Sequence, residues 1–578
     1  MIQELVNLST RVRESNPTVR SHDALDRVPV SIDCIIDKKG NFKRFLPHPK
    51  QMTVGERISA KKGKARLLVD KAEEVLGFGK KSDSKHRLFR EKLGLYSHLK
   101  ELGPAVSFYE SNRANGVTKA RAAFSKVDEK EQQGNIAFLV ASESKRLHEN
   151  EAVQNAIIEQ YEGSMEQLKN PRFGRCSICG STSYAVADLP HGMIKRVPDG
   201  QTSGCALVSY NDTAFESYGL KGNENSSICT RCAKAYVDAL NWLLSHGSLV
   251  HNEKGKEVFR YSNRKGISSD TAVVFWLRQA VETNLLEMLD NPTEDSVHAL
   301  FDAVFKGRPN AKIQNDTFYA ITLSGAAARI AVRDWIATSL EALQQNLARW
   351  FQDIKVARYD SDTKKLTNEF PRFSSLVWNL KGKSDNDVQH GRIGAALWKC
   401  AVMGHSPPLW VLSGVLGRVR AEQGNVTTER AALLKLSMNR KSNQQGGTKL
   451  MAALDESNSS IAYTCGRLFA VLESIQYHAL GGDVNAGIRE RFFSFASTMP
   501  STAFGRLMKM TQHHLSKIRG EKPGLAVNLD KKLQELMSRV EGTRFPTVFS
   551  LEDQASFAIG YYHQRHQDFT ATSTKKED

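Results

Sequence analysis

Four of the eight cysteines form two closely spaced pairs, and these pairs are the clearest chemical signal in the sequence. Cys176 and Cys179 make the first CxxC pair, and Cys229 and Cys232 make the second, about fifty residues later. A two-residue spacing brings both sulfurs of a pair to one side of a turn, so four thiolates can surround Zn²⁺ tetrahedrally. Four sulfur ligands leave no open coordination position, which predicts a structural zinc site.

The alternative interpretation is two coincidental or redox-active CxxC motifs. Arg175 and Arg231 lie next to the pairs, and Gly180 directly follows the first pair in a knuckle-like position, which favours the metal. The gap of about fifty residues between the two pairs argues against a zinc site, because zinc ribbons usually separate their pairs by about 15 to 20 residues. The sequence leaves both interpretations open.

Positive charge is the second signal. The chain of 578 residues carries 80 Lys and Arg against 63 Asp and Glu, a formal net charge of +17 at pH 7. Between Lys38 and Lys92 there are seventeen basic and six acidic residues, a net of +11. One region therefore holds most of the excess, which favours a polyanionic partner. A solvated lysine-rich face would give the same composition.

Other candidate groups carry less weight. His513 and His514 are adjacent, so on a helix they point about 100° apart and cannot share one metal as an i, i+4 pair would. The run Tyr561-Tyr562-His563 fits helix packing with polar tips better than a catalytic set. The sequence contains no P-loop, dinucleotide-binding, HExxH or GxSxG motif, which leaves the common routes to catalysis without support. We expect a protein that is not an enzyme.

Length and composition predict a folded chain of two to four domains, because one hydrophobic core stops growing near ~250 to 300 residues. Apolar residues make up 40% of the chain and charged residues 25%, as in ordinary globular proteins. No run of about eighteen apolar residues could cross a bilayer, and the first residues lack the order of a signal peptide. Eight cysteines are too sparse for a disulfide scaffold. We therefore expect a cytoplasmic protein without membrane contact.

The elements that position the basic groups begin with a helix over 2–13 and a β-hairpin. A β-rich run over 30–36, a polar turn over 37–41 and a return strand from 42 predict this hairpin. Further along, the apolar run 135–141 predicts a buried strand, and 151–161 predicts a helix.

Pro47 and Pro49 follow the hairpin, and a polar stretch over 55–63 comes next. We expect it to lead into an amphipathic helix over 68–76 that ends at Gly77. Backbone amides at the N-terminus of that helix would attract phosphate. The basic residues expected there are Arg57, Lys61, Lys62, Lys64 and Arg66.

The remaining pattern changes from mixed to purely helical. The stretch 173–232 has the composition of a small inserted module, and 271–276 and 317–323 read as strands. Apolar spacing predicts a long helix over 336–354. Mixed α/β architecture is expected to persist to about residue 360, after which strands vanish. A polar linker over 439–449 then precedes helices over 461–479 and 529–540, and Ser550 with Asp553 forms a capping box for the last helix.

These patterns predict an α+β fold: a mixed α/β N-terminal region with an inserted cysteine-rich zinc module, followed by a C-terminal α-helical bundle. The predicted regions are 1–165, basic; 166–250, a zinc-ribbon-like insertion; 251–360, α/β; and 361–578, the helical bundle.

Several segments closely resemble the large subunit of the type I-C CRISPR Cascade surveillance complex, a CRISPR-associated Csd-type family. The most specific are 463–473 (YTCGRLFAVLE), 492–504, 513–517, 551–554 and 560–565. Earlier stretches within 67–77, 270–276 and 324–333 agree, so the likeness covers nearly the whole chain.

The resemblance implies a non-catalytic subunit that recognises the protospacer-adjacent motif in duplex DNA, aids strand separation and R-loop formation, and docks the helicase-nuclease. Its implied partners are CRISPR RNA, double-stranded target DNA, and the backbone and crRNA-end-capping subunits of Cascade. The C-terminal bundle is implied to resemble a small subunit, which several subtypes make by internal translation from the same gene. Met438 and Met451 are candidate starts. Because guide pairing reads the sequence, such a protein needs a basic surface and no catalytic constellation.

On this basis we expect the hairpin tip and the following loop to bind the motif-bearing duplex: Lys38, Lys39, Asn41, Arg44, Lys50, Gln51, Arg57, Lys61, Lys62, Lys64 and Arg66. For the displaced strand we expect Arg440, Lys441, Lys449, Lys509, Lys517 and Arg519, against the alternative of ordinary solvated helix faces. Two other functions stay open: a metal-dependent nucleic-acid-processing enzyme and a stand-alone zinc-ribbon RNA-binding protein.

Overall fold

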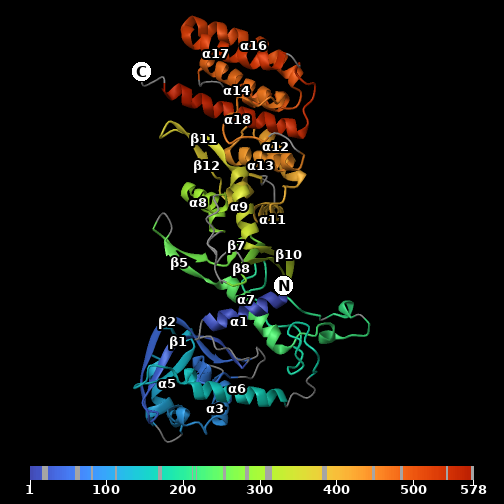
Figure 1. Ribbon diagram of the computed structural model, residues 1–578. Coiled ribbons are helices and arrows are strands. Elements are labelled where there is room, and N and C mark those ends of the chain that lie inside the picture. Colours follow the sequence, from blue (N-terminus) through green and yellow to red (C-terminus); the bar gives the residue numbers. More distant parts are fainter. Residues whose placement is uncertain are drawn as a thin grey trace. The chain divides into compact units, whose positions relative to one another are not determined.

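The computed structural model (Figure 1) divides into two compact units. The first unit comprises Met1–Ile194 and Ala206–Asn241, and the second comprises Lys195–Cys205 and Trp242–Asp578. The structure describes residues 1–15, 24–58, 65–79, 82–110, 114–129, 131–166, 172–210, 212–216, 218–251, 255–279, 286–305, 316–380, 387–445, 449–481, 486–541 and 544–574.

The first unit is built on a four-stranded sheet in the order β2-β1-β4-β3. The long hairpin of β1 (Leu25–Ile36) and β2 (Phe42–Glu56) is antiparallel, and β1 pairs in parallel with β4 (Ile136–Val140). β3 (Val69–Asp70) closes the other edge. The predicted hairpin and buried strand are thus confirmed.

Helices complete the first unit: α1 (Ile2–Ser15), α2 (Ala72–Val75), α3 (Ser82–Leu95), α4 (Gly103–Phe108), α5 (Lys119–Phe124) and α6 (Glu151–Glu166). The apolar faces of α2 to α6 and the sheet form one core, in which Phe108 packs edge-on against Phe138 of β4. This core holds the long hairpin in place.

Two predictions around the hairpin are wrong. β2 continues through Pro47 and Pro49 to Glu56, because β2 is an edge strand, where proline costs no ladder hydrogen bond. The helix expected over 68–76 is reduced to the single turn of α2, since Leu68 has a positive φ of 61° and the next two residues form β3. The expected end at Gly77 is confirmed by its φ of +64°.

The second unit begins with a sheet in the order β10-β9-β8-β7. Its strands are β7 (Arg264–Gly266), β8 (Thr271–Leu277), β9 (Thr317–Ala326) and β10 (Arg329–Ser339). One face carries Phe275, Phe318 and Ile336 into a core shared with α8 (Glu294–Phe305) and α9 (Leu340–Ile354). The helix predicted from 336 begins at Leu340, because the preceding residues pair with β9 as a strand.

Two antiparallel hairpins extend this region. β5 (Gly247–His251) pairs with β6 (Glu257–Tyr261), and β11 (Val356–Asp360) pairs with β12 (Lys365–Glu369).

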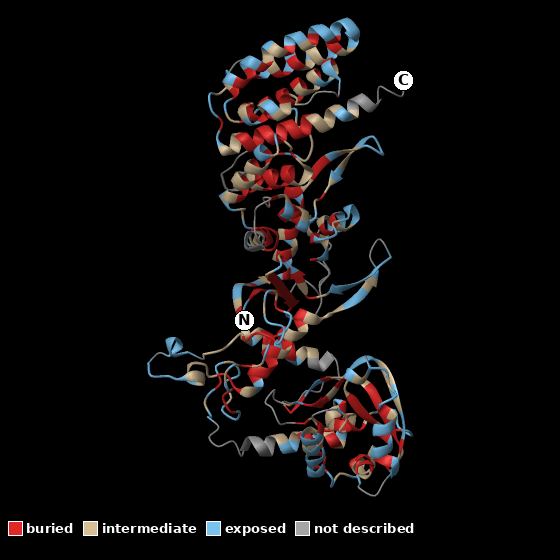
Figure 2. Ribbon diagram, turned by 180° about the vertical axis from the view of Figure 1, so that it is seen from behind, coloured by how far each residue is buried: buried red, intermediate tan, exposed pale blue. Residues whose placement is uncertain are grey.

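The expectation that strands vanish after about residue 360 is wrong by one strand, because β12 pairs with β11 as far as Glu369. After β12 the described chain is helical. Figure 2 shows the inward faces of these helices as buried and their outward faces as exposed. The predicted capping box is confirmed, since the amide of Asp553 donates to the Ser550 hydroxyl at 3.1 Å and the Ser550 amide donates to the Asp553 carboxylate at 3.0 Å. The helices are α10 (Phe373–Leu380), α11 (Asp387–Met403), α12 (Leu409–Ala421), α13 (Thr428–Gln445), α14 (Ile461–Leu480), α15 (Ile488–Ala496), α16 (Pro500–Glu521), α17 (Pro523–Glu541) and α18 (Leu551–Thr574).

The predicted fold class is confirmed: an α/β N-terminal region, a cysteine cluster and a helical C-terminal part. The division into four regions stays a prediction. Among the described helices we find none that is both long and apolar enough to cross a bilayer.

Candidate metal centre and nucleic-acid interface

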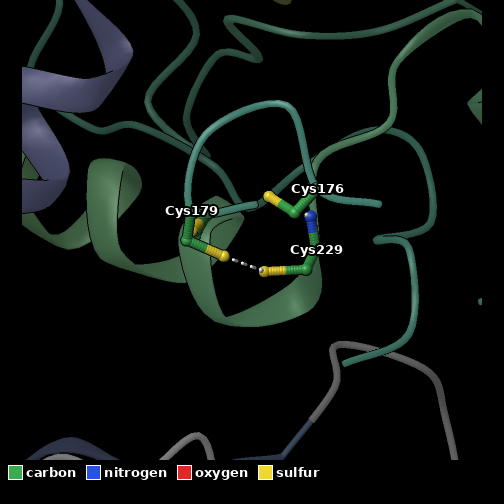
Figure 3. Close-up of side chains that lie close together, drawn as sticks. Cys176, Cys179 and Cys229 are labelled. Atoms are coloured by element: carbon green, nitrogen blue, oxygen red, sulfur yellow. Dashed lines mark hydrogen bonds between the residues drawn. The ribbon is translucent and has the colours of Figure 1, made fainter. Parts of the chain in front are cut away.

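The two cysteine pairs meet in the first unit (Figure 3). The four Sγ atoms of Cys176, Cys179, Cys229 and Cys232 all lie within 4.8 Å of one another, and those of Cys179 and Cys229 are 3.8 Å apart. Tetrahedral zinc with Zn–S bonds of about 2.3 Å requires sulfurs about 3.8 Å apart. The donor set therefore fits structural zinc, and it is the one group of potential metal ligands that we find in the described ranges.

The first pair sits on a tight turn. The amide of Gly180, whose φ is +71°, donates to the Cys176 carbonyl at 2.9 Å, and the amide of Cys176 donates to the Ser181 carbonyl at 2.9 Å. The amide of Ile178 donates to the Cys176 sulfur at 3.4 Å. Such N–H···S contacts favour the thiolate, which is the form that binds metal.

The second pair lies at the start of α7 (Thr230–Ser245). Cys229 precedes the helix and Cys232 lies in its first turn, where the unpaired helix amides favour negative charge. The Cys229 amide also donates to the Cys176 sulfur at 3.3 Å. The hydrogen bond from the Cys232 thiol lowers the pKa of the Cys229 thiol to about 5.

The long gap between the pairs is closed at its ends by backbone hydrogen bonds. The Ala187 amide donates to the Ile228 carbonyl at 2.9 Å, and the Ser177 amide donates to the Ser227 carbonyl at 2.7 Å. A β-bridge joins Val186 to Cys229. These contacts bring the two pairs together whatever the length of the insertion, which removes the objection raised by the spacing.

Five of the predicted duplex-binding residues are exposed cations on the hairpin. Lys38 and Lys39 occupy its turn, Arg44 and Lys50 lie on β2, and Arg57 directly follows it. None of the five forms an ion pair with another described residue. They constitute an unneutralised basic edge, which we call the hairpin edge.

The other N-terminal candidates are engaged or not described. The Asn41 amide donates to the Asp37 carboxylate at 3.0 Å, and Gln51 accepts from the Arg146 guanidinium at 2.7 Å. The Arg66 guanidinium donates to the Glu56 carbonyl at 3.0 Å. Lys61, Lys62 and Lys64 lie outside the described residues.

The C-terminal candidates differ in their surroundings. Arg440 is 2% exposed, pairs with Asp353 and donates to two backbone carbonyls. The prediction that Arg440 contacts DNA is therefore wrong, because its side chain is buried. Lys441 pairs with Glu552, and Arg519 lies 3.4 Å from Asp530.

Lys449, Lys509 and Lys517 are exposed, and none of them has an ion-pair partner among the residues described. The last two lie on α16.

The family comparison covers nearly all of these elements. A model of the family described as CRISPR-associated protein (Cas_Csd1) matches residues 5–569. The chain belongs to this CRISPR-associated family. As a Csd-type protein it is a component of CRISPR Cascade, and the type I-C subtype fits this family. Its partners include CRISPR RNA and other Cascade subunits. A search of curated proteins gave no significant match.

In this Csd-type chain, α16 carries two further basic side chains beside the predicted lysines: Arg506, which the sequence interpretation missed, and His513, which it considered only as a metal ligand. Arg506 and His513 are exposed and share a helix face with Lys509 and Lys517, at spacings of three and four residues. The Arg506 guanidinium lies 5.5 Å from the centre of the Phe492 ring. We call these four residues the α16 stripe. The 3-4-4 spacing of basic residues was the signal available in the sequence.

Proposed function

We propose that this Cascade component is a DNA-recognition subunit. It reads the protospacer-adjacent motif of duplex DNA, aids strand separation and R-loop formation, and docks the helicase-nuclease, all in the cytoplasm and without a catalytic step of its own. The observation that carries this proposal is the hairpin edge, five exposed cations without described ion-pair partners in a Cascade component.

The geometry of the hairpin edge suits duplex DNA. β2 is the outer strand of its sheet, so its backbone edge and its exposed side chains are open to a partner. Lys38 and Lys39 extend the charge to the turn. Lysine and arginine that contact phosphate release counterions, which supplies affinity without sequence preference. Base pairing with the guide then supplies the long-range specificity.

The α16 stripe is the proposed contact for the displaced strand. Lys509 and Lys517 are eight residues apart, which is about 12 Å along a helix axis, so both can follow one extended strand. Arg506 and Phe492 add a cation and an aromatic ring beside them, the combination that single-stranded nucleic acid binds.

Zinc, when bound by Cys176, Cys179, Cys229 and Cys232, supplies structural cross-linking and no chemistry. The four ligands would tie the two ends of the insertion to α7. Because all four positions are sulfur, a water or substrate has no coordination site.

The C-terminal helices could also be produced as a separate small subunit. α14 contacts α15, α16, α17 and α18, so these five helices share one bundle. A product starting at Met451, which is 58% exposed, keeps all five. A product starting at Met438, inside α13, would contain Arg440 but not its partner Asp353. The guanidinium charge, which is buried in the full chain, would then have no ion-pair partner. We propose Met451 as the start.

The start site is tested in cells with a C-terminal tag. Met451→Leu is expected to abolish the short product and Met438→Leu to leave it. A short product that survives Met451→Leu and disappears with Met438→Leu would reverse the assignment.

DNA recognition is tested on the assembled complex. The triple variant Lys38→Gln/Arg44→Gln/Lys50→Gln is compared with the equally discharged variant Arg87→Gln/Lys126→Gln/Lys145→Gln, which changes exposed residues elsewhere in the first unit. Each lost phosphate contact should lower the slope of log affinity against log salt by about 0.9 for the hairpin variant only. Equal slopes for both variants would remove the hairpin edge from the interface.

The proposed absence of catalysis has its own assay. Labelled DNA and RNA are incubated with the purified chain and Mg²⁺, Mn²⁺ or Zn²⁺. Sustained turnover that one carboxylate substitution abolishes would replace the proposal with a nucleic-acid-processing enzyme. A stable, monodisperse RNA complex of the chain alone would instead favour a stand-alone RNA-binding protein.

A further inference from the structure

The four sulfur ligands of the cysteine cluster differ in their access to solvent. Cys179 is exposed, whereas Cys176, Cys229 and Cys232 are buried. The residue after Cys179, Gly180, is exposed as well, and a Cβ added to it would meet no atom within 4 Å. Cys179 is therefore the cysteine at which a small solute from the surrounding water meets the cluster.

The Cys176 sulfur is held in place by two backbone donors. It accepts from the Ile178 amide at 3.4 Å and from the Cys229 amide at 3.3 Å. Hydrogen bonds of this kind draw charge from a thiolate and lower its nucleophilicity. Cys176 is thus both buried and the less reactive member of its pair, which leaves Cys179 as the reactive one.

The sulfur of Cys179 has a partner in the other cysteine pair. Its Sγ atom lies 3.8 Å from that of Cys229 (Figure 3), although the two residues are separated by fifty positions in the sequence. A disulfide bond is about 2 Å long. The two sulfurs therefore need to approach by roughly a further 1.8 Å to form a bond between the pairs.

The position of this sulfur pair matters for the insertion between the cysteine pairs. The Ser177 amide donates to the Ser227 carbonyl at 2.7 Å, and a β-bridge joins Val186 to Cys229. A bond from Cys179 to Cys229 would join the same two ends of the insertion that these contacts join. A disulfide within either pair would leave the ends connected by hydrogen bonds alone.

We propose that the cysteine cluster is a redox-sensitive closure of the insertion, in which hydrogen peroxide converts the Cys179 and Cys229 thiolates into a disulfide and zinc is released. The covalent bond replaces the metal as the link between the two pairs. This inference goes beyond the proposed DNA-recognition function and depends only on zinc binding by the cluster.

The oxidation proceeds in two steps. The Cys179 thiolate attacks one peroxide oxygen, so that an S–O bond forms, the O–O bond breaks and hydroxide leaves. The Cys229 thiolate then attacks the Cys179 sulfur, forms the S–S bond and displaces a second hydroxide. Two solvent protons convert both hydroxides into water, and the two sulfurs lose the two electrons that the peroxide gains.

Release of the metal follows from the loss of two ligands. The remaining thiolates, those of Cys176 and Cys232, provide half of the four ligands of a structural zinc site. Reduction of the disulfide by a dithiol restores all four thiolates, so the oxidised chain can take up zinc again. The switch is therefore reversible.

The first test identifies the bond on the unaltered protein. The zinc-loaded assembled complex is treated with hydrogen peroxide, released zinc is measured with a coloured chelator, and remaining thiols are alkylated. Trypsin then separates Cys229 from Cys232, because it cleaves after Arg231, and the relevant peptides are 176–195, 222–231 and 232–234. We expect a disulfide between the first two peptides, assigned to Cys179 by fragmentation, in step with zinc release.

Different linkages would overturn the proposal. A disulfide within either pair, a bond to Cys232 in place of Cys229, or zinc release without any disulfide would each contradict it. Retention of zinc at peroxide concentrations that oxidise an exposed model thiol would do so as well.

Matched cysteine variants locate the reacting sulfurs. Cys176→Ser keeps both proposed partners and should still form the disulfide between Cys179 and Cys229, even with reduced zinc content. Cys179→Ser should abolish it. Cys205→Ser changes a buried cysteine outside the cluster and should behave like the parent protein. Equal disulfide yields from Cys176→Ser and Cys179→Ser would remove Cys179 from the reaction.

Proteolysis tests whether the disulfide keeps the insertion closed. Peroxide and a chelator both remove zinc, but cleavage between Leu189 and Leu220 should stay slow after peroxide and become fast after chelation. A dithiol added with the chelator to the oxidised sample should make its cleavage as fast as that of the chelated sample. Equally fast cleavage after peroxide alone would overturn the closure.

These outcomes are independent of the DNA-recognition function. Each readout is a metal content, a disulfide linkage or a cleavage rate, so failure of the inference leaves the proposed function standing. Failure of the hairpin-edge test would in turn leave the cysteine chemistry unaffected. A chain that is purified without zinc and takes up none would overturn this inference alone.

Discussion

Arg440 of α13 and Asp353 of α9 form a buried ion pair, with the guanidinium Nε 2.8 Å from the carboxylate Oδ2 and the two side chains 2% and 8% exposed. The same guanidinium donates to the carbonyls of Cys400 at 2.6 Å and His405 at 2.5 Å. Arg440 thus joins α9, α11 and the start of the following loop to α13. A residue that composition alone would assign to a nucleic-acid surface instead holds the helical core together.

Replacing Arg440 with Leu should strongly destabilise the protein. Removing one partner of a buried ion pair leaves the other charge uncompensated, which costs about 3–5 kcal/mol. The loss is measured as a decrease in the free energy of unfolding of the second unit in urea. Lys441→Leu breaks a partly exposed pair with Glu552 and should cost no more than about 1 kcal/mol. Similar losses in both variants would contradict the structural role of Arg440.

Gly466 of α14 and Gly560 of α18 allow these two helices to touch through their backbones. A Cβ on Gly560 would lie 2.2 Å from the Tyr463 carbonyl oxygen, and one on Gly466 would lie 1.9 Å from the Phe557 carbonyl oxygen. Gly560→Ala must therefore push the helices apart, and we expect a loss of about 1–3 kcal/mol, as for other overpacked cores. Thermal unfolding would show it as a lower Tm.

Gly505 on α16 provides the matched control for the helix crossing. A Cβ there meets no atom within 4 Å, so Gly505→Ala should stabilise the helix by up to about 1 kcal/mol. Opposite changes in Tm for the two glycine-to-alanine variants are the expected result. A neutral Gly560→Ala would show that α14 and α18 do not cross as closely as described.

The cysteine cluster should bind one zinc ion per chain. Elemental analysis of the purified protein checks the stoichiometry, and Cys179→Ser should lower it because three thiolates and a hydroxyl hold zinc less well. Cys465→Ser is the control, since Cys465 is buried in α14 and burial raises its pKa to about 12, which disfavours the metal-binding thiolate. Equal zinc contents in the two variants would exclude the cluster as the metal site.

Zinc removal should also loosen the insertion between the cysteine pairs. That segment is closed by few backbone hydrogen bonds besides the four cysteines, so a chelator should speed proteolysis at Leu189–Leu220. Adding zinc back should restore protection. Unchanged cleavage after the metal is lost would mean that hydrogen bonds alone hold the insertion.

Features set by neighbouring residues were predictable from the sequence. The spacing within each cysteine pair and the capping box of Ser550 and Asp553 both appear as expected. Wrong predictions came from partners that are distant in the sequence. Arg440 looked like part of a polar linker because its carboxylate lies 87 residues away, and nothing local showed that β2 would be an edge strand able to accept prolines.

The contact between the 196–204 loop and the β9–β10 turn was invisible for the same reason. Gly200 and Ala327 are separated by more than a hundred residues, and the residue types at these positions read as an ordinary turn and an ordinary hairpin.

His563 of α18 makes the free energy of unfolding depend on pH. Burial lowers its pKa to about 3, and its Nδ1 atom is hydrogen-bonded to the Tyr463 hydroxyl at 2.9 Å. In the unfolded chain a histidine has a pKa near ~6.5. At pH values between these two pKa values, the imidazole of His563 is protonated in the unfolded state and neutral in the folded state. The unfolding free energy contributed by His563 is therefore complete above pH ~6.5 and falls as the pH is lowered towards 3.

Replacing His563 with Gln should remove this acid sensitivity while keeping a hydrogen-bonding partner for Tyr463. A histidine shifted in this way contributes a slope of up to about 1.4 kcal/mol per pH unit. We expect the variant to be less stable at pH 7 and its unfolding free energy to fall less steeply between pH 6 and 4. His513→Gln, on the exposed face of α16, should retain the slope of the parent protein. If both variants show the parent slope, His563 is not held neutral in the folded bundle.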